Sequence, residues 1–406
     1  SNIASLTTTV DGNVSAVSDA AAGAISSSIG GAIAFNLIGW EVGDLFTQTL
    51  NALIGTDIGE TERVYAVTAE TTDAVMDSAG MLTVQAHSDA TITSNVTNQL
   101  LQEATAIFGS MGASGGAVVA RNMVSTSTGA NIDYTTAQTA INAGDDVSVK
   151  ATDNSQVTAT ATMVASSTSG GDINGITLSD SDSVAVGGIV ALNDMSGGAE
   201  AYINNAVVNA DTGNILVQAV NAAALTATLE TEAESSGGSS FNTGTSLAIN
   251  GLISSNSLQG GAQAYVVDSE LNTADTNAGS GNVTVDAEIS ASLTADTLNA
   301  TTSGATGIGA TLSFNTLGYA PQNILFNTVD AILGDPLIAD AYVLGSGADA
   351  NSYLLDTKVD ATGMLEIMAT AAAHLAASVT YKTDSAASVL FGSPEGLSFG
   401  AVVSQN

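Results

Sequence analysis

The stretch from Gly213 to Glu230, GNILVQAVNAAALTATLE, decides the fold. Apolar side chains fall on every second position, and only Asn221 interrupts this alternation: Ile215, Val217, Ala219, Ala223, Leu225, Ala227 and Leu229. A period of two is that of a β-strand with one buried face. The polar residue halfway along predicts that the stretch is two strands that meet at a tight bend.

The same pattern recurs in four other places, which begin at Leu82, Val147, Val283 and Leu365. The middle position holds Ser88, Asp153, Ile289 and Ala371 in turn, and the first half of each stretch ends near one Ala column: Ala86, Ala151, Ala219, Ala287 and Ala369. Strands that recur at a fixed period without intervening helices indicate stacked repeats. We therefore predict a repeated unit of about 65 residues.

A second landmark is a Gly followed six residues later by Asn, with an apolar strand between them. The six occurrences are Gly30 and Asn36, Gly116 and Asn122, Gly187 and Asn193, Gly244 and Asn250, Gly309 and Asn315, and Gly400 and Asn406. A recurring Asn at one strand end suits a ladder of stacked amides. Alternatively, Asn simply tolerates the turn conformation there.

These landmarks predict an all-β fold, a parallel and right-handed β-solenoid. At roughly 20 residues per coil, each unit would make about three coils. One continuous segment of a larger protein is expected over 1–406. Its units would be 1–100, 101–165, 166–231, 232–300, 301–383 and a partial 384–406.

Two segments depart from this plan, because FNLIGWEVGDLFTQTLNALIG from Phe35 aligns without gaps with FNTLGYAPQNILFNTVDAILG from Phe314. Their apolar residues have helical spacing, which predicts short amphipathic helical insertions at about 37–60 and 316–340. The expected anchors are Trp40, Phe46, Tyr319 and Leu325. Each helix would cover exposed core, or alternatively dock a neighbouring chain.

Charge limits the function. The chain has 40 acidic residues against 5 Lys and Arg, a formal net charge of −35. Nucleic acids and anionic membranes need clustered basic side chains, so both are excluded as partners. The absence of Cys excludes a disulfide framework and is compatible with a large secreted bacterial protein. No apolar run is long enough to span a membrane.

Candidates for chemistry are few. His87 and His374 are expected on the solvent face of their strands, and GASGG at Gly112–Gly116 resembles a nucleophile elbow but is interpreted as a turn. No catalytic residue, cofactor or enzyme activity is therefore predicted. Carboxylates in loops could bind calcium at Asp145, Asp146, Asp180 and Asp182, although solvated acidic turns are the simpler interpretation.

The FNxxGW and FNxxGY segments with their NALIG and DAILG endings, together with AYI-type strands and G-x-[LIV]-x-[LIV]-x-A stretches, resemble one group of proteins. These are the giant secreted tandem-repeat surface proteins of cyanobacteria and other aquatic bacteria, adhesin-like and broadly similar to filamentous-haemagglutinin-type β-helical exoproteins. The resemblance implies a location outside the cell, at the cell surface or in the extracellular matrix.

The predicted function is therefore structural: a stiff stalk, filament or surface layer with an adhesive role. The expected partners are other copies, which assemble end to end or laterally, and glycans or cell surfaces. The alternative is a carbohydrate-active β-helix, such as a polysaccharide lyase or hydrolase, or a glycan-binding module. A lyase or hydrolase would need clustered carboxylates in a groove.

Overall fold

A computed structural model describes residues 4–41, 61–136, 140–170, 181–237, 245–274, 281–318, 347–386 and 395–406. These residues form strands and connecting turns and contain no helix. All paired strands run parallel, apart from the short antiparallel pair β2 (Trp40–Glu41) and β3 (Thr61–Glu62). The prediction of an all-β fold with parallel, solenoid-like strand stacking is confirmed.

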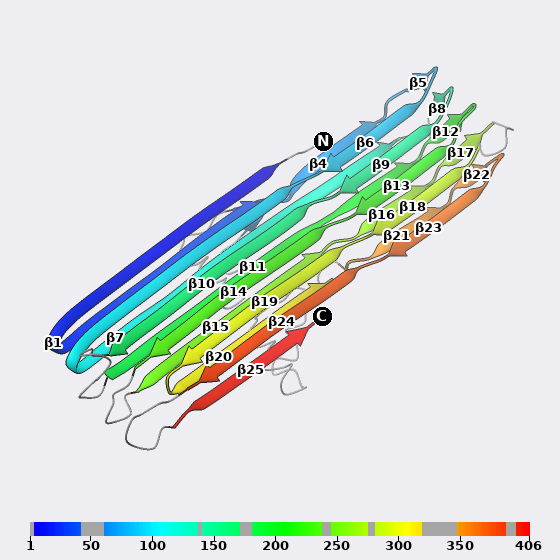
Figure 1. The fold of residues 1–406 in the computed structure, drawn as a ribbon. Coiled ribbons are helices and arrows are strands. Elements are labelled where there is room, and N and C mark those ends of the chain that lie inside the picture. Colours follow the sequence, from blue (N-terminus) through cyan, green and yellow to red (C-terminus); the bar gives the residue numbers. More distant parts are fainter. Residues whose placement is uncertain are drawn as a thin grey trace.

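Each coil has a long arm of two layers (Figure 1). The outgoing layer contains the first halves of β1 (Ser5–Ile38) and β7 (Thr91–Asp133), with β10 (Gln156–Gly170), β14 (Ala224–Ser236), β19 (Ser292–Ser303) and β24 (His374–Ser385). The returning layer contains their second halves, with β11 (Ser181–Asn204), β15 (Ser246–Gln259), β20 (Thr306–Leu317) and β25 (Leu397–Gln405). The chain reverses within β1 at Gly23 and within β7 at Gly109, which have φ of 72° and 62°. Glycine adopts such positive φ values without strain.

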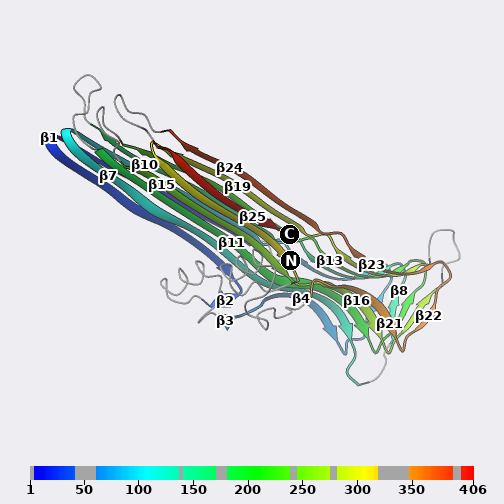
Figure 2. The ribbon, with the colours of Figure 1, turned by 90° about the horizontal axis from the view of Figure 1, so that it is seen from below.

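The opposite end of the coil, the base, is built from three further sets of stacked strands (Figure 2). The first set continues the returning layer through β4 (Tyr65–Thr72), β16 (Ala262–Val267) and β21 (Ala350–Leu355). The second is β5 (Asp77–Ser78), β8 (Ala140–Ala143), β12 (Val207–Ala210), β17 (Glu270–Thr273) and β22 (Lys358–Asp360). The third is β6 (Leu82–Ser88), β9 (Val147–Asp153), β13 (Ile215–Asn221), β18 (Val283–Ile289) and β23 (Leu365–Ala371).

The strand register confirms the alternating stretches as one column. Ala86, Ala151, Ala219, Ala287 and Ala369 are direct partners in neighbouring strands. Each stretch is also two strands, as Asn221 predicted: β13 ends at Asn221 and β14 begins at Ala224. Each alternating stretch, which we call the stripe, therefore supplies the last base strand of one coil and the outgoing strand that follows it.

The prediction of about three coils per unit was wrong. Asn122 and Asn193 lie in adjacent strands although they are 71 residues apart, so one repeat makes one coil. The reason is strand length: β10 has 15 residues and β11 has 24, and such strands use up a whole repeat in one circuit. Each coil is therefore wide, and each repeat adds only one strand spacing to the length of the solenoid.

Two motif assignments also need correction. GASGG at Gly112–Gly116 lies inside β7 and is not a turn. Asn250 pairs with Gly187 and thus belongs to the glycine column, while Asn256 pairs with Asn193 and fills the asparagine column. In this coil the sequence pattern of Gly and Asn was therefore matched six residues too early: Asn250 was assigned to the asparagine column, which Asn256 occupies. Gly244 lies outside the described residues.

Two apolar clusters form the core. The larger one fills the base, around Ile141, Val217 and Leu271, and the second lies between the two layers of the arm, around Leu100, Met163 and Leu229. A glycine column makes room in the arm, because a Cβ at Gly116 would lie 2.3 Å from Leu100 Cδ1. The small residues of one layer therefore admit the large residues of the other.

The two predicted helical insertions fall mainly outside the described residues, as do Phe46, Tyr319 and Leu325. Their first residues are strand, since β1 runs to Ile38 and β20 to Leu317. Trp40 lies in β2, half-buried, opposite Glu62. On the outer side of the returning layer, Val119, Val190, Leu192 and Phe314 form a small buried cluster.

Candidate functional site

The most regular chemical feature is a ladder of asparagine side chains along the inside of the returning layer. Each amide nitrogen donates to the amide oxygen of the next coil at 2.8–3.0 Å, through Asn36, Asn122, Asn193, Asn256, Asn315 and Asn406. Stacked amides satisfy one another in this way because each has donors and an acceptor. The hypothesis of an amide ladder is confirmed.

The ladder also joins the two layers of the arm. The same amide nitrogens donate across the interior to main-chain oxygens of the outgoing layer, as Asn193 does to Thr226 O at 2.8 Å and Asn256 does to Thr294 O at 2.8 Å. Asn122, Asn193 and Asn256 are fully buried. A buried amide with all its partners stabilises one alignment of the layers, since any slip would leave several polar groups unpaired.

Asn250 shows how a coil compensates for a change in the glycine column. Its amide oxygen accepts from Thr231 Oγ1 at 2.9 Å, and its nitrogen donates to Asn299 Oδ1 at 3.1 Å. Thr231 and Asn299 occupy the outgoing-layer column that holds Met163 in an earlier coil. A polar pair thus replaces the packing of a large apolar side chain over glycine.

A second ladder crosses the interior near the tip of the arm and consists of serine hydroxyl groups. It zigzags between the layers at 2.9–3.1 Å through Ser167, Ser183, Ser235, Ser246 and Ser303. The first of these, Ser167, donates to Gln102 Oε1 at 2.6 Å. The arm interior therefore has a polar row near its tip and another near its base. Between them the packing is mainly apolar, apart from the contacts of Thr231, Asn250 and Asn299.

An aromatic column runs along the base. Tyr202, Tyr265 and Tyr353 stack with ring centroids 5.0 Å apart and almost parallel planes. The hydroxyl of Tyr265 donates to Glu200 Oε1 at 2.7 Å, and burial together with this carboxylate raises the pKa of Tyr265. Both ring faces of Tyr265 are occupied by its neighbours, so this ring cannot offer a face to a sugar ring.

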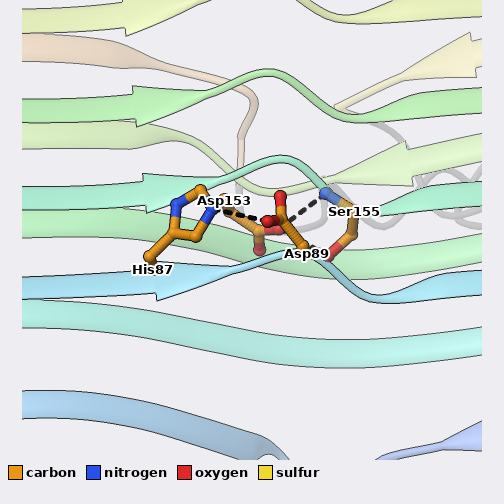
Figure 3. A network of polar contacts seen from close by, with 4 residues as sticks. All are labelled: His87, Asp89, Asp153 and Ser155. Atoms are coloured by element: carbon orange, nitrogen blue, oxygen red, sulfur yellow. Dashed lines mark hydrogen bonds and ion pairs between the residues drawn. The ribbon is translucent and has the colours of Figure 1, made fainter. Parts of the chain in front are cut away.

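A buried carboxyl group, that of Asp153, lies at the bend between the two strands of the alternating stretch (Figure 3). It is fully buried and accepts hydrogen bonds from Ser155 N at 3.0 Å, Ser155 Oγ at 2.5 Å and Thr126 Oγ1 at 2.8 Å. Burial raises the pKa of Asp153, and the nearby Asp89 adds to the rise, although the three hydrogen bonds oppose it. A carboxyl group with a raised pKa could serve acid–base chemistry, but Asp153 is closed off from solvent.

His87 lies beside this bend, with its Nε2 at 2.6 Å from Asp89 Oδ2 (Figure 3). Its side chain is about a quarter exposed, and His374 is exposed on β24. Both histidines therefore lie where the strand pattern predicted, on the solvent side of their strands. His87 and Asp89 lie in one coil, and Asp153 lies in the next.

The predicted calcium residues lie in different parts of the coil. Asp145 and Asp146 form the turn before β9, where Asp146 Oδ1 accepts from Asn214 N at 2.7 Å. Asp182 begins β11 near the tip and accepts from Thr245 N at 2.9 Å. Asp180 lies outside the described residues. The observed bonds tie each turn to the next coil, and calcium binding stays a prediction.

One shallow concavity, of about 700 Å³, lies at the corner between the base strands. Its lining is polar and acidic: Asp133, Tyr134, Thr135, Asn204, Asn205, Asp268 and Asp356. Asn205, Asp268 and Asp356 have φ between 48° and 53°, so the polar residues are explained by the left-handed corner that they form. In the described ranges, no group of three His, Cys, Asp or Glu side chains is arranged to hold a metal ion.

Comparison of the chain with protein-family models, curated proteins and solved structures finds no match. Among the described residues, no helix is long and apolar enough to cross a membrane. The site must therefore be interpreted from its own geometry, which is that of repeated columns.

The sequence interpretation missed the serine ladder and the pairing of the two layers. The signal for the serine ladder was present in the sequence, because Ser167 and Ser235 are separated by the same 68 residues as Val149 and Val217. The sequence contains no such signal for which residues of the outgoing layer pack against which residues of the returning layer. This pairing requires knowing where the chain reverses, at Gly23 and Gly109.

Proposed function

We propose that this chain is a structural repeat protein, a broad and stiff segment of an extracellular surface layer, filament or stalk. The observation that carries the proposal is the asparagine ladder, which passes without a break from Asn36 in β1 to Asn406, the residue after β25. Because each rung also holds the opposite layer, bending the stack requires buried hydrogen bonds to break in both layers.

The shape of the coil favours a broad layer over a long stalk. Neighbouring strands are separated by roughly 4.8 Å, so six of them add only about 24 Å along the axis. A strand of 15 residues such as β10 spans roughly 50 Å across it. A protein built this way is wide and stiff, and each added repeat lengthens it by only about 4.8 Å.

The proposed setting is the cell surface or the extracellular matrix, and the proposed partners are further copies of the repeat. The acidic chain, with its net charge of −35, would stay dispersed in salt. Antibodies against the chain should label intact source cells at their surface. Labelling only after the cells are opened would contradict this location.

Mechanical unfolding of single molecules tests the structural role. Pulling on the two ends should produce a sawtooth of force peaks, each releasing one coil of about 65 residues, because each coil is held by its own rung of the ladder. Smooth extension at low force, without steps of this size, would contradict a load-bearing role.

A binding role has one observation in its favour, a row of threonines on the outside of the outgoing layer. Thr7, Thr93, Thr158, Thr226 and Thr294 are partners in adjacent strands and repeat at the strand spacing of about 4.8 Å. Such a row could recognise glycans or another ordered surface. A glycan array, and sedimentation with insoluble polysaccharide, test this role, and replacing Thr158 and Thr226 by Lys should abolish any binding found.

A further inference from the structure

The middle of the outer side of the returning layer, between Asp182 and Asp194 of β11, is almost free of charge. Six aligned segments form it: 27–35, 113–121, 184–192, 247–255, 306–314 and 397–405. They contain none of the 40 acidic residues of the chain, and their single charged residue is Arg121, which is buried and lies 3.8 Å from Asp194. We call this surface the neutral face.

An apolar ridge runs along the neutral face, parallel to the solenoid axis. It is one register column: Ile29, Gly115, Val186, Ile249, Ile308 and Phe399. Ile29 is 79% exposed, Val186 38% and Phe399 60%. Ile249 and Ile308 are partly exposed. Large apolar side chains that are aligned on a sheet and exposed to water mark an interaction surface.

A groove lies beside this ridge, formed by the next outward column: Gly31, Ala117, Gly188, Gly251, Ala310 and Ala401. No side chain in it is larger than a methyl group. Beyond it rises the column of Val119 and Val190, which is already buried within the chain. The neutral face therefore has the relief of a ridge beside a groove.

The glycines of the groove have no reason to be small within the chain itself. A Cβ at Gly251 would meet nothing within 4 Å, and at Gly188 it would meet only Gly251 O, at 4.0 Å. The inward Gly116 differs, since a Cβ there would lie 2.3 Å from Leu100. Glycine inside a strand is less stable than Ala, and it often marks the close approach of another backbone.

We propose that the neutral face pairs with the neutral face of a second copy, each ridge lying in the groove of the other. The partner must be uncharged where it contacts this face. It must also carry a ridge that runs along the solenoid axis with the same strand spacing. A second copy of the chain meets both conditions. The pairing also turns the acidic surfaces of both copies away from each other, which lowers their mutual repulsion. Sheets packed face to face in this way lie about 10 Å apart.

Lateral pairing must be separated from stacking along the axis. Thr91 N donates to Ala4 O, so in a parallel ladder the odd residues of the first half of β1 direct their N–H groups to the open edge. Thr9 is such a residue and its side chain is exposed. Thr9→Pro therefore blocks strand addition at that edge and leaves the pairing of β1 with β7 in place.

The experiment measures the mass of the 406-residue chain by sedimentation equilibrium in the Thr9→Pro background. A dimer is expected, and Ile29→Lys and Val186→Lys should each weaken it at least tenfold. Thr228→Lys, a charge on the exposed outer side of the outgoing layer, is the matched control and should leave the dimer unchanged. Thermal unfolding of each variant checks that the fold is intact.

Gly251→Leu distinguishes a fitted groove from general stickiness. This variant adds apolar surface but fills the groove, so it should weaken the dimer, whereas nonspecific association would become stronger. A monomer at every concentration would overturn the proposal. An equal weakening of the dimer by the Thr228→Lys control would also overturn it. So would a chain that does not dimerise but binds uncharged lipid vesicles, if Ile29→Lys abolishes that binding.

Discussion

The outgoing and returning layers of the arm have the same inner pattern and opposite outer surfaces. The outgoing layer carries Thr, Asn and eight acidic residues on its outer side, namely Asp11, Asp19, Glu103, Glu230, Glu232, Glu234, Asp296 and Asp384. The neutral face of the returning layer has no acidic residue. Inner columns are dictated by packing and hydrogen bonding between the layers, so only the outer columns are free to acquire different functions.

Breaking the bond between the two layers should have the largest effect. Asn193→Leu would leave Thr226 O, Asn122 Nδ2 and Asn256 Oδ1 without their partner inside the arm. Each buried unpaired group costs about 1–3 kcal/mol. Asn122 Nδ2 keeps its bond to Thr158 O, so the full cost falls on the other two groups, and we expect roughly 2–6 kcal/mol of lost stability. Urea unfolding followed by circular dichroism measures this loss. Asn95→Ala, on the outer side of the outgoing layer, is the control and should change stability by less than about 0.5 kcal/mol.

Inner and outer glycines should respond in opposite directions. Gly116→Ala places a methyl group 2.3 Å from Leu100 and 2.4 Å from Gly30 O, so overpacking should cost about 1–3 kcal/mol. Gly251→Ala meets nothing within 4 Å and should be neutral or stabilising by about 0.5–1 kcal/mol. The melting temperatures of the two variants give the comparison. Equal destabilisation by both variants would contradict the assignment of Gly116 to the inner side of the returning layer and of Gly251 to its outer side.

The corner that leads into the outgoing layer should be pH-sensitive. The pKa of Asp153 is raised by burial, so the native state holds its proton to higher pH than the unfolded chain. Stability should therefore fall as pH rises from about 4 through the raised pKa. Asp153→Asn should remove this slope and stabilise the protein at pH 7 by on the order of 1 kcal/mol.

Below the pKa of the unfolded carboxyl group the advantage of Asp153→Asn should vanish, because both states of the parent are then protonated. Urea unfolding between pH 3 and pH 8 measures this difference. A variant that is less stable than the parent throughout the range would show that the hydrogen bonds from Ser155 and Thr126 outweigh the cost of burial.

The outer charges of the outgoing layer should have the smallest effect. Glu230, Glu232 and Glu234 are exposed on one side of β14 and repel one another. Glu232→Gln should stabilise the fold by a few tenths of a kcal/mol at low salt, and the gain should shrink in 0.5 M NaCl as screening increases. A gain that is independent of salt would point to a cause other than charge repulsion.

Much of the fold could be predicted from the sequence, because β-strand periodicity is local. The stripe around Asn221, its bend and the alignment of the Ala column all follow from alternation and spacing, and the structure has each of them. The asparagine ladder could be predicted as well, since Asn122 and Asn193 recur in the same motif.

The remaining features depend on contacts between distant segments. The number of coils per repeat depends on strand length, and nothing local shows that β7 continues through GASGG without a turn. Asn250 was misplaced because its column can be recognised only from its partners, Thr231 and Asn299. The neutral face was missed because outward and inward glycines look the same in a sequence.

The central claim is that one repeat makes one coil, and a single engineered disulfide tests it most directly. Thr160 and Thr228 are direct partners in β10 and β14 on the outer side of the outgoing layer, and the chain has no Cys of its own. Strand neighbours lie roughly 4.8 Å apart, within the range that a disulfide can bridge. Oxidised Thr160→Cys/Thr228→Cys should form an intramolecular disulfide in nearly every molecule, detected by mass spectrometry. Free thiols or only intermolecular products would contradict the one-coil architecture.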